Sequence, residues 1–366
     1  MAMTPVVHLI KELLERECEV TVFTLDPEVQ DEVILKGDHL QFCIGPYRKH
    51  GRARDFFRVE QDYLRNAILR ENPDIVHAHW TYEFAQSALD SGIPTLVTAH
   101  DVPLILLQYD SSPYRIMRTF MTWKVIRSAK FMTGVSPHVV DHIKRWFNYK
   151  NHIQVVPNGL PDQIFLNKNT RSDSLQLQSK TIFASVLTGW GKNKNGPALI
   201  RAFNLLRKQK PLAELWMFGA GFGKGEEAEI WASQKGLGDG INYIGEVTFD
   251  TLIHRLAAEV DILVHPAFEE SFGMSVVEAM AVGLPVIGGK SSGGIPFILN
   301  YGKAGILTDV HHPKAIFSAM DLLATNDDLR KKVALHGNQY AFENFTITKV
   351  ADQYQTIYAR ILHQPG

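Results

Sequence analysis

The sequence predicts an α/β protein with two doubly wound domains in tandem, on the basis of three observations. The chain has 366 residues, which at roughly 150 residues per domain corresponds to two or three domains. Short, nearly continuous apolar runs alternate with amphipathic stretches, a pattern typical of buried parallel strands covered by helices. The alternation breaks at the turn signal Asn158-Gly159 and then begins again. In such domains the ligand binds at the carboxyl ends of the strands, so we expect it in the cleft between the two domains.

The first half, residues 1–160, is expected to form the N-terminal domain. It opens with a helix, because apolar residues recur at helical spacing from Thr4 to Arg16. Further helices are expected at Asp55 to Glu71, near Ser112 to Ser128 and at Pro137 to Phe147. The expected strands are Val20 to Leu25, His39 to Ile44, Asp74 to His79, Pro94 to His100, Phe131 to Val135 and Ile153 to Val156.

The second half, residues 161–345, is expected to form the C-terminal domain after a polar linker from Asn167 to Lys180. From Pro313 the chain is mostly helical, and the amphipathic segment Thr348 to Leu362 predicts a final helix within residues 346–366. The expected strands are Thr181 to Leu187, Leu215 to Gly219, Ile241 to Gly245, Ile262 to His265, Pro285 to Ile287 and Gly305 to Leu307.

The start of the chain departs from the usual order of a doubly wound domain. Such a domain opens with a strand and a glycine-rich turn, so about 15 to 20 residues are expected to be absent before the first helix. The strands that begin at Val20 and Asp74 would then flank a gap, with unpaired backbone groups that cost roughly 1–3 kcal/mol each. We expect either that the gene begins upstream or that the chain is a fragment with an incomplete, inactive N-terminal domain. A strand from Met1 to Pro5, or direct pairing of the two flanking strands, would contradict this expectation.

Composition excludes several classes of protein. Hydrophobic residues make up 45% and charged residues 21%, which is ordinary for a globular protein and unlike a disordered chain. A formal net charge of −1 argues against a general nucleic-acid binder. Cys18 and Cys43 have no Cys or His at zinc-ligand spacing, so we expect a reducing compartment, the cytoplasm, and no structural metal. No apolar stretch is long enough for a membrane span or a signal peptide.

The segment from His265 to Leu299, HPAFEESFGMSVVEAMAVGLPVIGGKSSGGIPFIL, carries the most chemistry. A strand leads into a loop with two glutamates, and a helix follows. The N-terminus of a helix offers free amide groups and positive partial charge, which suit a diphosphate. Glu278 can accept two hydrogen bonds from a ribose diol, and Glu270 can hold the hydroxyls of a sugar. The amides expected to bind the diphosphate are those of Phe272, Gly273, Met274 and Ser275.

Two glutamates eight positions apart are weak evidence by themselves, since about one such pair is expected by chance. A solvated carboxylate and a helix charge are the alternative. In the context ESFGMSVVEAMAVGLPVI, however, Glu270 and Glu278 match an E-x7-E motif, and the sequence resembles the retaining glycosyltransferases of family 4. The resemblance extends to TGVSPHVVDHI, VVPNGLPDQIF and the tail helix, and implies the GT-B fold, with two domains facing a cleft. LWMFGAG resembles the family's second C-domain strand and turn, and INYIGEVTFDTL resembles the segment that lines the nucleobase. The resemblance implies that Gly219 and Gly245 bind the donor.

The resemblance implies a second donor-binding segment at Thr188 to Asn195, TGWGKNKN. The family typically has an arginine and, five residues later, a lysine that bind the diphosphate. Lys194 matches the lysine, but Gly189 stands at the arginine position. Lys192, in the same loop, is the candidate to supply the missing charge, and a solvated lysine is the alternative for both. Cations here would stabilise the charge that develops on the leaving diphosphate.

His100, at the end of the strand VTAHD, matches the family's N-domain histidine, which contacts the donor sugar near the reacting carbon. A structural histidine is the alternative. His77 and His79 alternate along VHAHW, and we expect them to point to opposite faces of the strand. No third ligand lies at workable spacing for a metal site. The loop Gly293 to Pro296 resembles the glycine-rich loop beneath the donor, with Phe297 where the family often has glutamate.

The sequence thus predicts a retaining hexosyltransferase that uses a nucleotide sugar and no metal, because helix amides and Lys194 can replace a cation. The expected catalytic residues are His100, Glu270 and Lys194, and Glu270 would hold and orient the sugar. Retention through a short-lived ion pair and retention through a covalent intermediate are both compatible with the sequence. The expected acceptor is a glycan or a lipid-linked molecule in polysaccharide biosynthesis. A sugar-nucleotide epimerase, which would need a further pair of carboxylates, and a non-catalytic nucleotide-sugar binder are the alternatives.

Two basic runs in the first half, Tyr47 to Arg58 and Tyr114 to Lys130, interleave cations with aromatic residues. A basic amphipathic helix is typical of contact with a membrane surface or an anionic acceptor. An ordinary solvated face is the alternative. Lipid-linked acceptors are common in the resembled family, which favours a cytoplasmic protein that binds peripherally to a membrane.

Overall fold

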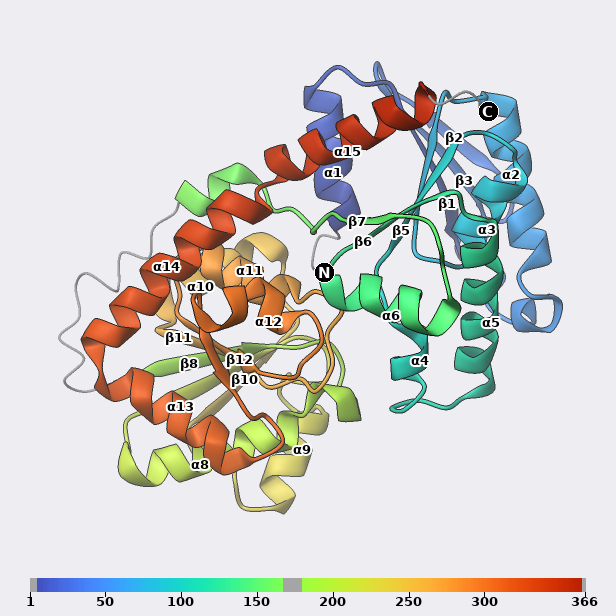
Figure 1. The fold of residues 1–366 in the computed structure, drawn as a ribbon. Helices are drawn as coiled ribbons and strands as arrows, with labels where there is room; N and C mark the ends of the chain where they lie inside the picture. Colours follow the sequence, from blue (N-terminus) through green and yellow to red (C-terminus); the bar gives the residue numbers. More distant parts are fainter. Residues whose placement is uncertain (1–4, 167–179, 364–366) are drawn as a thin grey trace. The chain divides into compact units, whose positions relative to one another are not determined.

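The computed structural model describes residues 5–166 and 180–363, drawn in colour in Figure 1. These residues form two compact units. The N-terminal unit consists of Pro5–Pro157 and Thr348–Gly366, and the C-terminal unit of Asn158–Ile347. The predicted linker falls, apart from Lys180, outside the described residues.

The C-terminal unit is built on one parallel sheet, which within the described residues has six strands in the order β10-β9-β8-β11-β12-β13. All six correspond to strands predicted from the sequence. Most of these strands are buried apolar segments, as expected for a sheet covered by helices on both faces. Their bounds are β8 Ile182–Val186, β9 Glu214–Phe218, β10 Ile241–Gly245, β11 Ile262–His265, β12 Val286–Gly289 and β13 Ile306–Thr308.

Helices cover both faces of this sheet (Figure 1). One face carries α8, α9 and α13, whose apolar side chains join those of β8, β9 and β11 in a common core. The other face carries α10, α11, α12 and α14. The helices are α8 Gly196–Gln209, α9 Glu227–Gln234, α10 Phe249–Glu259, α11 Met274–Ala281, α12 Ile295–Ile298, α13 Pro313–Thr325 and α14 Asp327–Phe345, with short 3₁₀ turns η2 Asp162–Leu166, η3 Lys192–Lys194 and η4 Asn300–Gly302.

The N-terminal unit contains two sheets within the described residues. Strands β4 Val76–His79, β5 Thr95–Ala99, β6 Phe131–Gly134 and β7 Ile153–Val155 form a parallel sheet in chain order. Strands β1 Val20–Asp26, β2 Val33–Lys36 and β3 Leu40–Pro46 form a second sheet in the order β1-β3-β2. The sequence did not predict β2, a short strand whose residues are all exposed and which pairs antiparallel with β3. The helices are α1 Pro5–Glu15, α2 Arg58–Glu71, α3 Glu83–Asp90, α4 Pro103–Leu106, α5 Pro113–Ser128, α6 Pro137–Phe147 and α15 Ile347–Leu362, with a 3₁₀ turn η1 Arg52–Asp55.

Each of the two sheets of the N-terminal unit has at one edge a strand that the sequence analysis singled out, β1 in one sheet and β4 in the other. Among the described residues β1 pairs only with β3, and β4 only with β5, so the two flanking strands do not pair directly. Pro5 begins α1, and Met1 to Thr4 lie outside the described residues. Helix α15 packs in this unit, where Arg16 donates to Asp352 at 2.7 Å and to the Thr348 carbonyl at 2.8 Å.

Candidate active site

The strand order of the C-terminal sheet reverses between β8 and β11, and the loops that follow these strands meet there. In an open α/β sheet this switch point is where ligands bind. Lys194, from the loop after β8, places its Nζ 2.5 Å from Oε1 of Glu270, in the loop after β11. Nε2 of His265, at the end of β11, lies 3.5 Å from the same oxygen. The structure thus brings together two of the residues predicted to be catalytic, and adds a histidine that the sequence analysis did not single out.

Backbone contacts hold the two loops in register. The amide of Phe268 donates to the carbonyl of Asn193 at 2.7 Å. The buried side-chain amide of Asn195 donates to the carbonyls of Pro266, at 2.9 Å, and Val310, at 2.8 Å. These bonds fix the backbone on both sides of Lys194 and in the segment just before Glu270, so the two loops that carry the ion pair are held together.

Glu270 is held in its ionised form. Burial by itself would raise the pKa of its carboxyl, but the ammonium group of Lys194 and the neighbouring His265 outweigh burial and lower the pKa to about 2. A carboxylate that stays ionised over the physiological range can accept hydrogen bonds from hydroxyl groups at any such pH. This is the property that the predicted role of Glu270 requires.

Helix α11 begins directly after this loop. Gly273 adopts a left-handed conformation with φ 106°, and a Cβ there would lie 2.7 Å from Cδ1 of Ile295. The amides of Val276 and Val277 bond back to the Gly273 carbonyl, so the amide groups earlier in the turn have no partner within the helix. The predicted donors differ in exposure, since Phe272 and Gly273 are buried and Met274 and Ser275 are partly exposed.

Glu278 has the opposite environment to Glu270. Helix α11 is buried on nearly all sides, and the Glu278 side chain, one turn in, is only 3% exposed. Burial raises the pKa of Glu278 to about 7. The two glutamates of the E-x7-E motif therefore have pKa values on opposite sides of their usual range, which is typical of carboxylates with different tasks in one site.

The predicted glycine-rich loop packs against the backbone of Glu270. Gly294 donates its amide to the Glu270 carbonyl at 2.7 Å. At Gly293, with φ +55°, a Cβ would lie 2.2 Å from the same carbonyl oxygen. Only glycine fits this approach, so the loop supports Glu270 from behind. Phe297, at the departure from the family pattern, packs its ring 6.1 Å from that of Phe345.

The remaining predicted donor-binding residues lie at neighbouring strand ends of the same sheet. Gly219, directly after β9, donates to the carbonyl of Gly245, the last residue of β10, at 2.8 Å. Gly189 has φ +79° and open space where a side chain would project. Lys192 is exposed in η3, two residues before Lys194. Lys192 is thus near the ion pair in sequence, but within the described residues the ion partner of Glu270 is Lys194.

His100 lies in the N-terminal unit, directly after β5, where its Nε2 is 2.9 Å from Nδ1 of His79. The prediction that His77 and His79 point to opposite faces is wrong. Their rings lie 4.1 Å apart on the same face of β4, because successive side chains alternate and residues i and i+2 share a face. Among residues 5–166 and 180–363, no three His, Cys, Asp or Glu side chains gather as a metal site.

Two family models match the chain. "Glycosyltransferase Family 4" matches residues 4–163, and "Glycosyl transferases group 1" matches residues 167–339. The chain belongs to the family 4, or group 1, glycosyltransferases. The switch-point residues Lys194 and Glu270 lie within the group 1 match.

Relatives of this glycosyltransferase have different names. A D-inositol 3-phosphate glycosyltransferase from Paenarthrobacter aurescens is 26% identical over 300 residues, 78% of this chain and 73% of the relative. An N-acetyl-alpha-D-glucosaminyl L-malate synthase from Bacillus anthracis is 24% identical over 304 residues, 80% of this chain and 76% of the relative.

Solved structures share the fold. Sucrose-phosphate synthase from Thermosynechococcus elongatus aligns with a TM-score of 0.81 at 17% identity, over 97% of this chain and 92% of that one. The likeness confirms the predicted GT-B fold. In the part of the chain that the structure describes, no helix is both long and apolar enough to cross a bilayer.

Proposed function

We propose that this glycosyltransferase moves a hexosyl unit from a nucleotide sugar to a glycan or lipid-linked acceptor, with retention at the anomeric carbon. The observation that carries the proposal is the Lys194–Glu270 pair at the switch point of the C-terminal sheet, directly before helix α11. A cation, a helix N-terminus and two carboxylates with opposite pKa shifts are the groups that a diphosphate, a ribose and a sugar need. The family resemblance supports the hexosyl group and retention.

Each part of the donor has a proposed partner. The amides from Phe272 to Ser275 bind the diphosphate, and Glu278 accepts from the ribose diol. Glu270, which stays ionised, accepts from the sugar hydroxyls. Lys194 has three N–H donors, so it can bond Glu270 and a phosphate oxygen together and stabilise charge on the leaving diphosphate. In this proposal these groups do the work of a metal ion, and a chelator leaves turnover unchanged.

The proposal covers several chemical classes of acceptor. The names of the relatives include an inositol phosphate and a hydroxy acid, so both belong in the test beside glycans and lipid-linked acceptors. The test is to measure release of nucleoside diphosphate from a panel of nucleotide sugars, with and without each acceptor. The anomeric configuration of any product is then determined by NMR.

The outcomes separate the alternatives. Acceptor-dependent release with retained configuration is the expected result. Conversion of the donor to an epimer without release would identify an epimerase. Nucleotide binding without release under any condition would identify a non-catalytic binder, and inverted product would refute the proposed stereochemistry. The Glu270→Gln variant serves as the site-directed control in each assay.

We also propose that this glycosyltransferase binds an anionic lipid surface through helix α5. Ile116, Phe120 and Trp123 share one face of the helix and are 57%, 53% and 43% exposed. The opposite face, with Met121 and Val125, is buried. An exposed apolar and aromatic stripe opposite a buried face is typical of helices that lie at a membrane interface.

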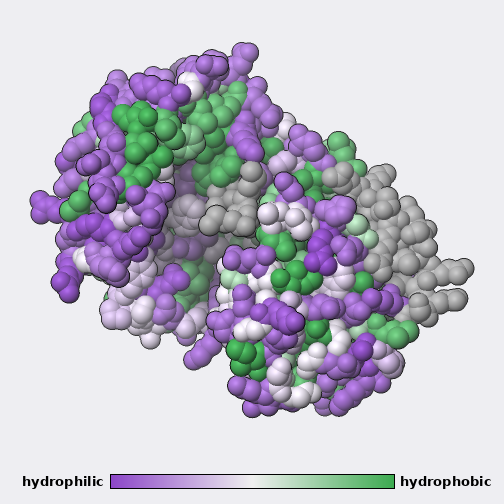
Figure 2. Space-filling view, turned by 180° about the vertical axis from the view of Figure 1, so that it is seen from behind, coloured by the Kyte–Doolittle hydropathy of each residue, from purple (hydrophilic) through white to green (hydrophobic). Residues whose placement is uncertain are grey.

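Charge and a neighbouring aromatic residue support this partner. The exposed Lys124 and Arg127 lie beside the stripe, and the Arg127 guanidinium is 4.8 Å from the Trp123 ring. Phe56, 49% exposed, lies 6.0 Å from Phe120. Figure 2 shows hydrophobic residues gathered in patches on the surface of the molecule. Cations around exposed aromatic side chains fit an anionic headgroup layer over an apolar one.

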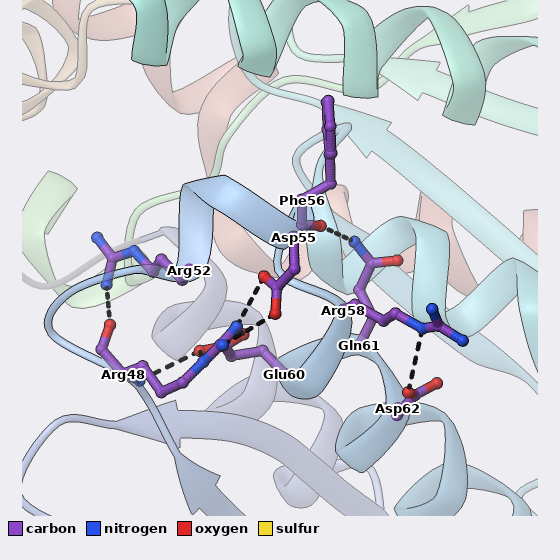
Figure 3. Close-up of polar contacts among 8 residues, drawn as sticks. All are labelled: Arg48, Arg52, Asp55, Phe56, Arg58, Glu60, Gln61 and Asp62. Atoms are coloured by element: carbon purple, nitrogen blue, oxygen red, sulfur yellow. Dashed lines mark hydrogen bonds and ion pairs between the residues drawn. The ribbon is translucent and has the colours of Figure 1, made fainter.

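The basic run Tyr47 to Arg58 contributes less charge to this surface than its sequence suggests. Arg48 donates to both Asp55, at 2.9 Å, and the buried Glu60, at 2.7 Å. Figure 3 shows this network, with the Phe56 side chain projecting away from it. Arg48 is thus a structural cation, which anchors the turn that presents Phe56.

Vesicle sedimentation of the full chain tests this partner. Wild-type protein is expected to bind phosphatidylcholine vesicles that contain phosphatidylglycerol, and less so at high salt. A Phe120→Ser/Trp123→Ser variant is expected to lose about tenfold in affinity. Leu335→Ser, which changes an exposed leucine of the C-terminal unit, is the matched control. Equal binding by both variants, or no binding by the wild type, would contradict the proposal.

A further inference from the structure

Three histidines gather on and just after two adjacent strands in the N-terminal unit. His77 and His79 lie on β4, and His100 directly follows β5. The ring centroid of His79 lies 4.1 Å from that of His77, at an interplanar angle of 36°, and its Nδ1 is 2.9 Å from Nε2 of His100. His79 therefore lies between a histidine that is anchored in the fold and one that the sequence predicts to be catalytic.

His77 is bonded at both ring nitrogens. Its Nε2 lies 2.7 Å from the hydroxyl of Thr98 on β5, and its Nδ1 lies 2.7 Å from the hydroxyl of Tyr358 on α15. With both nitrogens engaged, the ring cannot rotate without breaking a bond. It provides a fixed surface against which His79 packs.

His100 is held at one edge and one face. His79 bonds its Nε2, and the indole of Trp80 lies 4.8 Å away at an interplanar angle of 35°. Trp80 has φ +63°, in the left-handed region, and its amide donates to the Thr98 carbonyl at 2.9 Å. Within the described residues, the bond to His79 is the hydrogen bond that fixes the His100 ring.

One hydrogen atom lies between the two imidazoles. Burial lowers the pKa of His79 to about 4 and that of His100 well below its ordinary value, so both rings are neutral near pH 7. A neutral imidazole carries hydrogen on one nitrogen only. If His79 donates from Nδ1, then His100 carries its hydrogen on Nδ1; if His79 accepts, Nδ1 of His100 is an acceptor.

We infer that His79 is a positioning residue, which holds His100 in a single ring orientation and a single tautomer. The inference rests on the predicted role of His100 as a residue that contacts the donor sugar. The tautomer of His79 thereby sets whether Nδ1 of His100 is a hydrogen-bond donor or an acceptor. A group that must meet a reacting sugar in one geometry loses rate when its ring can flip, and a misplacement of about 1 Å can cost about 100-fold.

Substitutions at His79 separate positioning from packing. His79→Phe fills the space but removes the bond to His100, and is expected to lower kcat about 10- to 100-fold with nucleoside diphosphate affinity unchanged. His79→Asn places a side-chain amide near the position of Nδ1, and is expected to recover most of kcat. His77→Phe, on the same face but without a contact to His100 Nε2, is the matched control, and should lower Tm more than kcat. Equal kcat losses in the Phe and Asn variants of His79 would overturn the inference.

Imidazole nitrogen NMR of the full chain gives a readout that does not depend on activity. In the wild type, His100 is expected to show one neutral tautomer, and in His79→Phe a mixture of two. Two tautomers in the wild type, or an unchanged spectrum in the variant, would overturn the inference; if His79→Phe does not fold, the wild-type spectrum still decides. Full turnover by His100→Ala would refute the proposed role of His100 and leave the tautomer result standing, so the two failures can be told apart.

Discussion

Replacing Glu278 with glutamine is expected to stabilise the C-terminal unit at alkaline pH and to have no such effect in acid. The Glu278 side chain is 3% exposed, and burial raises its pKa from 4.5 to about 7. At about 1.4 kcal/mol per pKa unit, this rise corresponds to about 3 kcal/mol of unfolding free energy. The cost falls on the ionised carboxylate, which glutamine does not form.

The sign of the pH dependence follows from proton uptake. The folded protein binds a proton at Glu278 more tightly than the unfolded chain does, so the favourable contribution is fully present below pH 4.5 and is lost as the pH rises through about 7. Wild type and Glu278→Gln should therefore have similar stability near pH 4. At about pH 8 the variant should be more stable by about 3 kcal/mol.

Urea unfolding at the two pH values measures this difference, with hydrogen exchange in α11 to assign it to the C-terminal unit. Glu227→Gln, which changes an exposed glutamate of the same unit, is the control and should show no pH-dependent difference. A stabilisation that is equal at both pH values, or a destabilisation at about pH 8, would refute the reasoning. Nucleotide binding supplies a second check. A ribose diol prefers the ionised carboxylate, so binding near pH 7 should release protons in wild type and none in Glu278→Gln.

Three further predictions concern Glu270, Lys194 and the glycine-rich loop at Gly293. Glu270→Gln should lower kcat and spare nucleoside diphosphate affinity in equilibrium titration; parallel losses would contradict the separate roles of the two glutamates. Lys194→Ala should lower diphosphate affinity and kcat together. It should also lower the free energy of unfolding in urea by about 3 kcal/mol, because Glu270 is left as an uncompensated, mostly buried charge. If Lys192→Ala changes neither diphosphate affinity nor kcat, Lys192 does not replace the arginine that the family has at the position of Gly189. Gly293→Ala should lower Tm and kcat, because its Cβ would lie 2.2 Å from the Glu270 carbonyl, and an unchanged Tm would show that the loop can move aside.

The fold was largely predictable because buried strands can be recognised in the sequence by their apolar residues. Strands such as Ile262–His265 are continuous apolar runs, and the prediction matches the observed bounds. Strand β2, Val33–Lys36, was missed because it is a short strand, exposed throughout, whose pairing with β3 depends on a hairpin rather than on burial. The error at His77 and His79 had a different origin, since the period of a strand is two residues and both side chains had to share a face.

The sequence predicted which residues belong to the site but not which of them contact one another. Lys194 and Glu270 were each expected at the donor, yet they lie 76 positions apart, and their ion pair exists only because the strand order brings the loops after β8 and β11 together. His265 and His79 were not assigned roles for the same reason. Their sequence signal, a histidine at the end of a parallel strand, was present, but the contacts of His265 with Glu270 and of His79 with His100 exist only in the folded chain.

The two glutamates of the E-x7-E motif show what the structure adds to the sequence. Their residue type is the same and they are eight positions apart, so sequence alone assigns both simply as carboxylates. The structure places one beside an ammonium group, which keeps it ionised, and buries the other in a helix surrounded by apolar residues, which favours its neutral form. A ligand that brings hydroxyl donors to both would meet a permanently charged acceptor at Glu270 and one at Glu278 that must first release a proton near pH 7. Nucleotide affinity should therefore rise with pH between about 6 and 8 through Glu278, while the contribution of Glu270 stays constant. Isothermal titration of the wild type and Glu278→Gln over this range tests this division, and a pH slope that persists in the variant would assign the titration to another group.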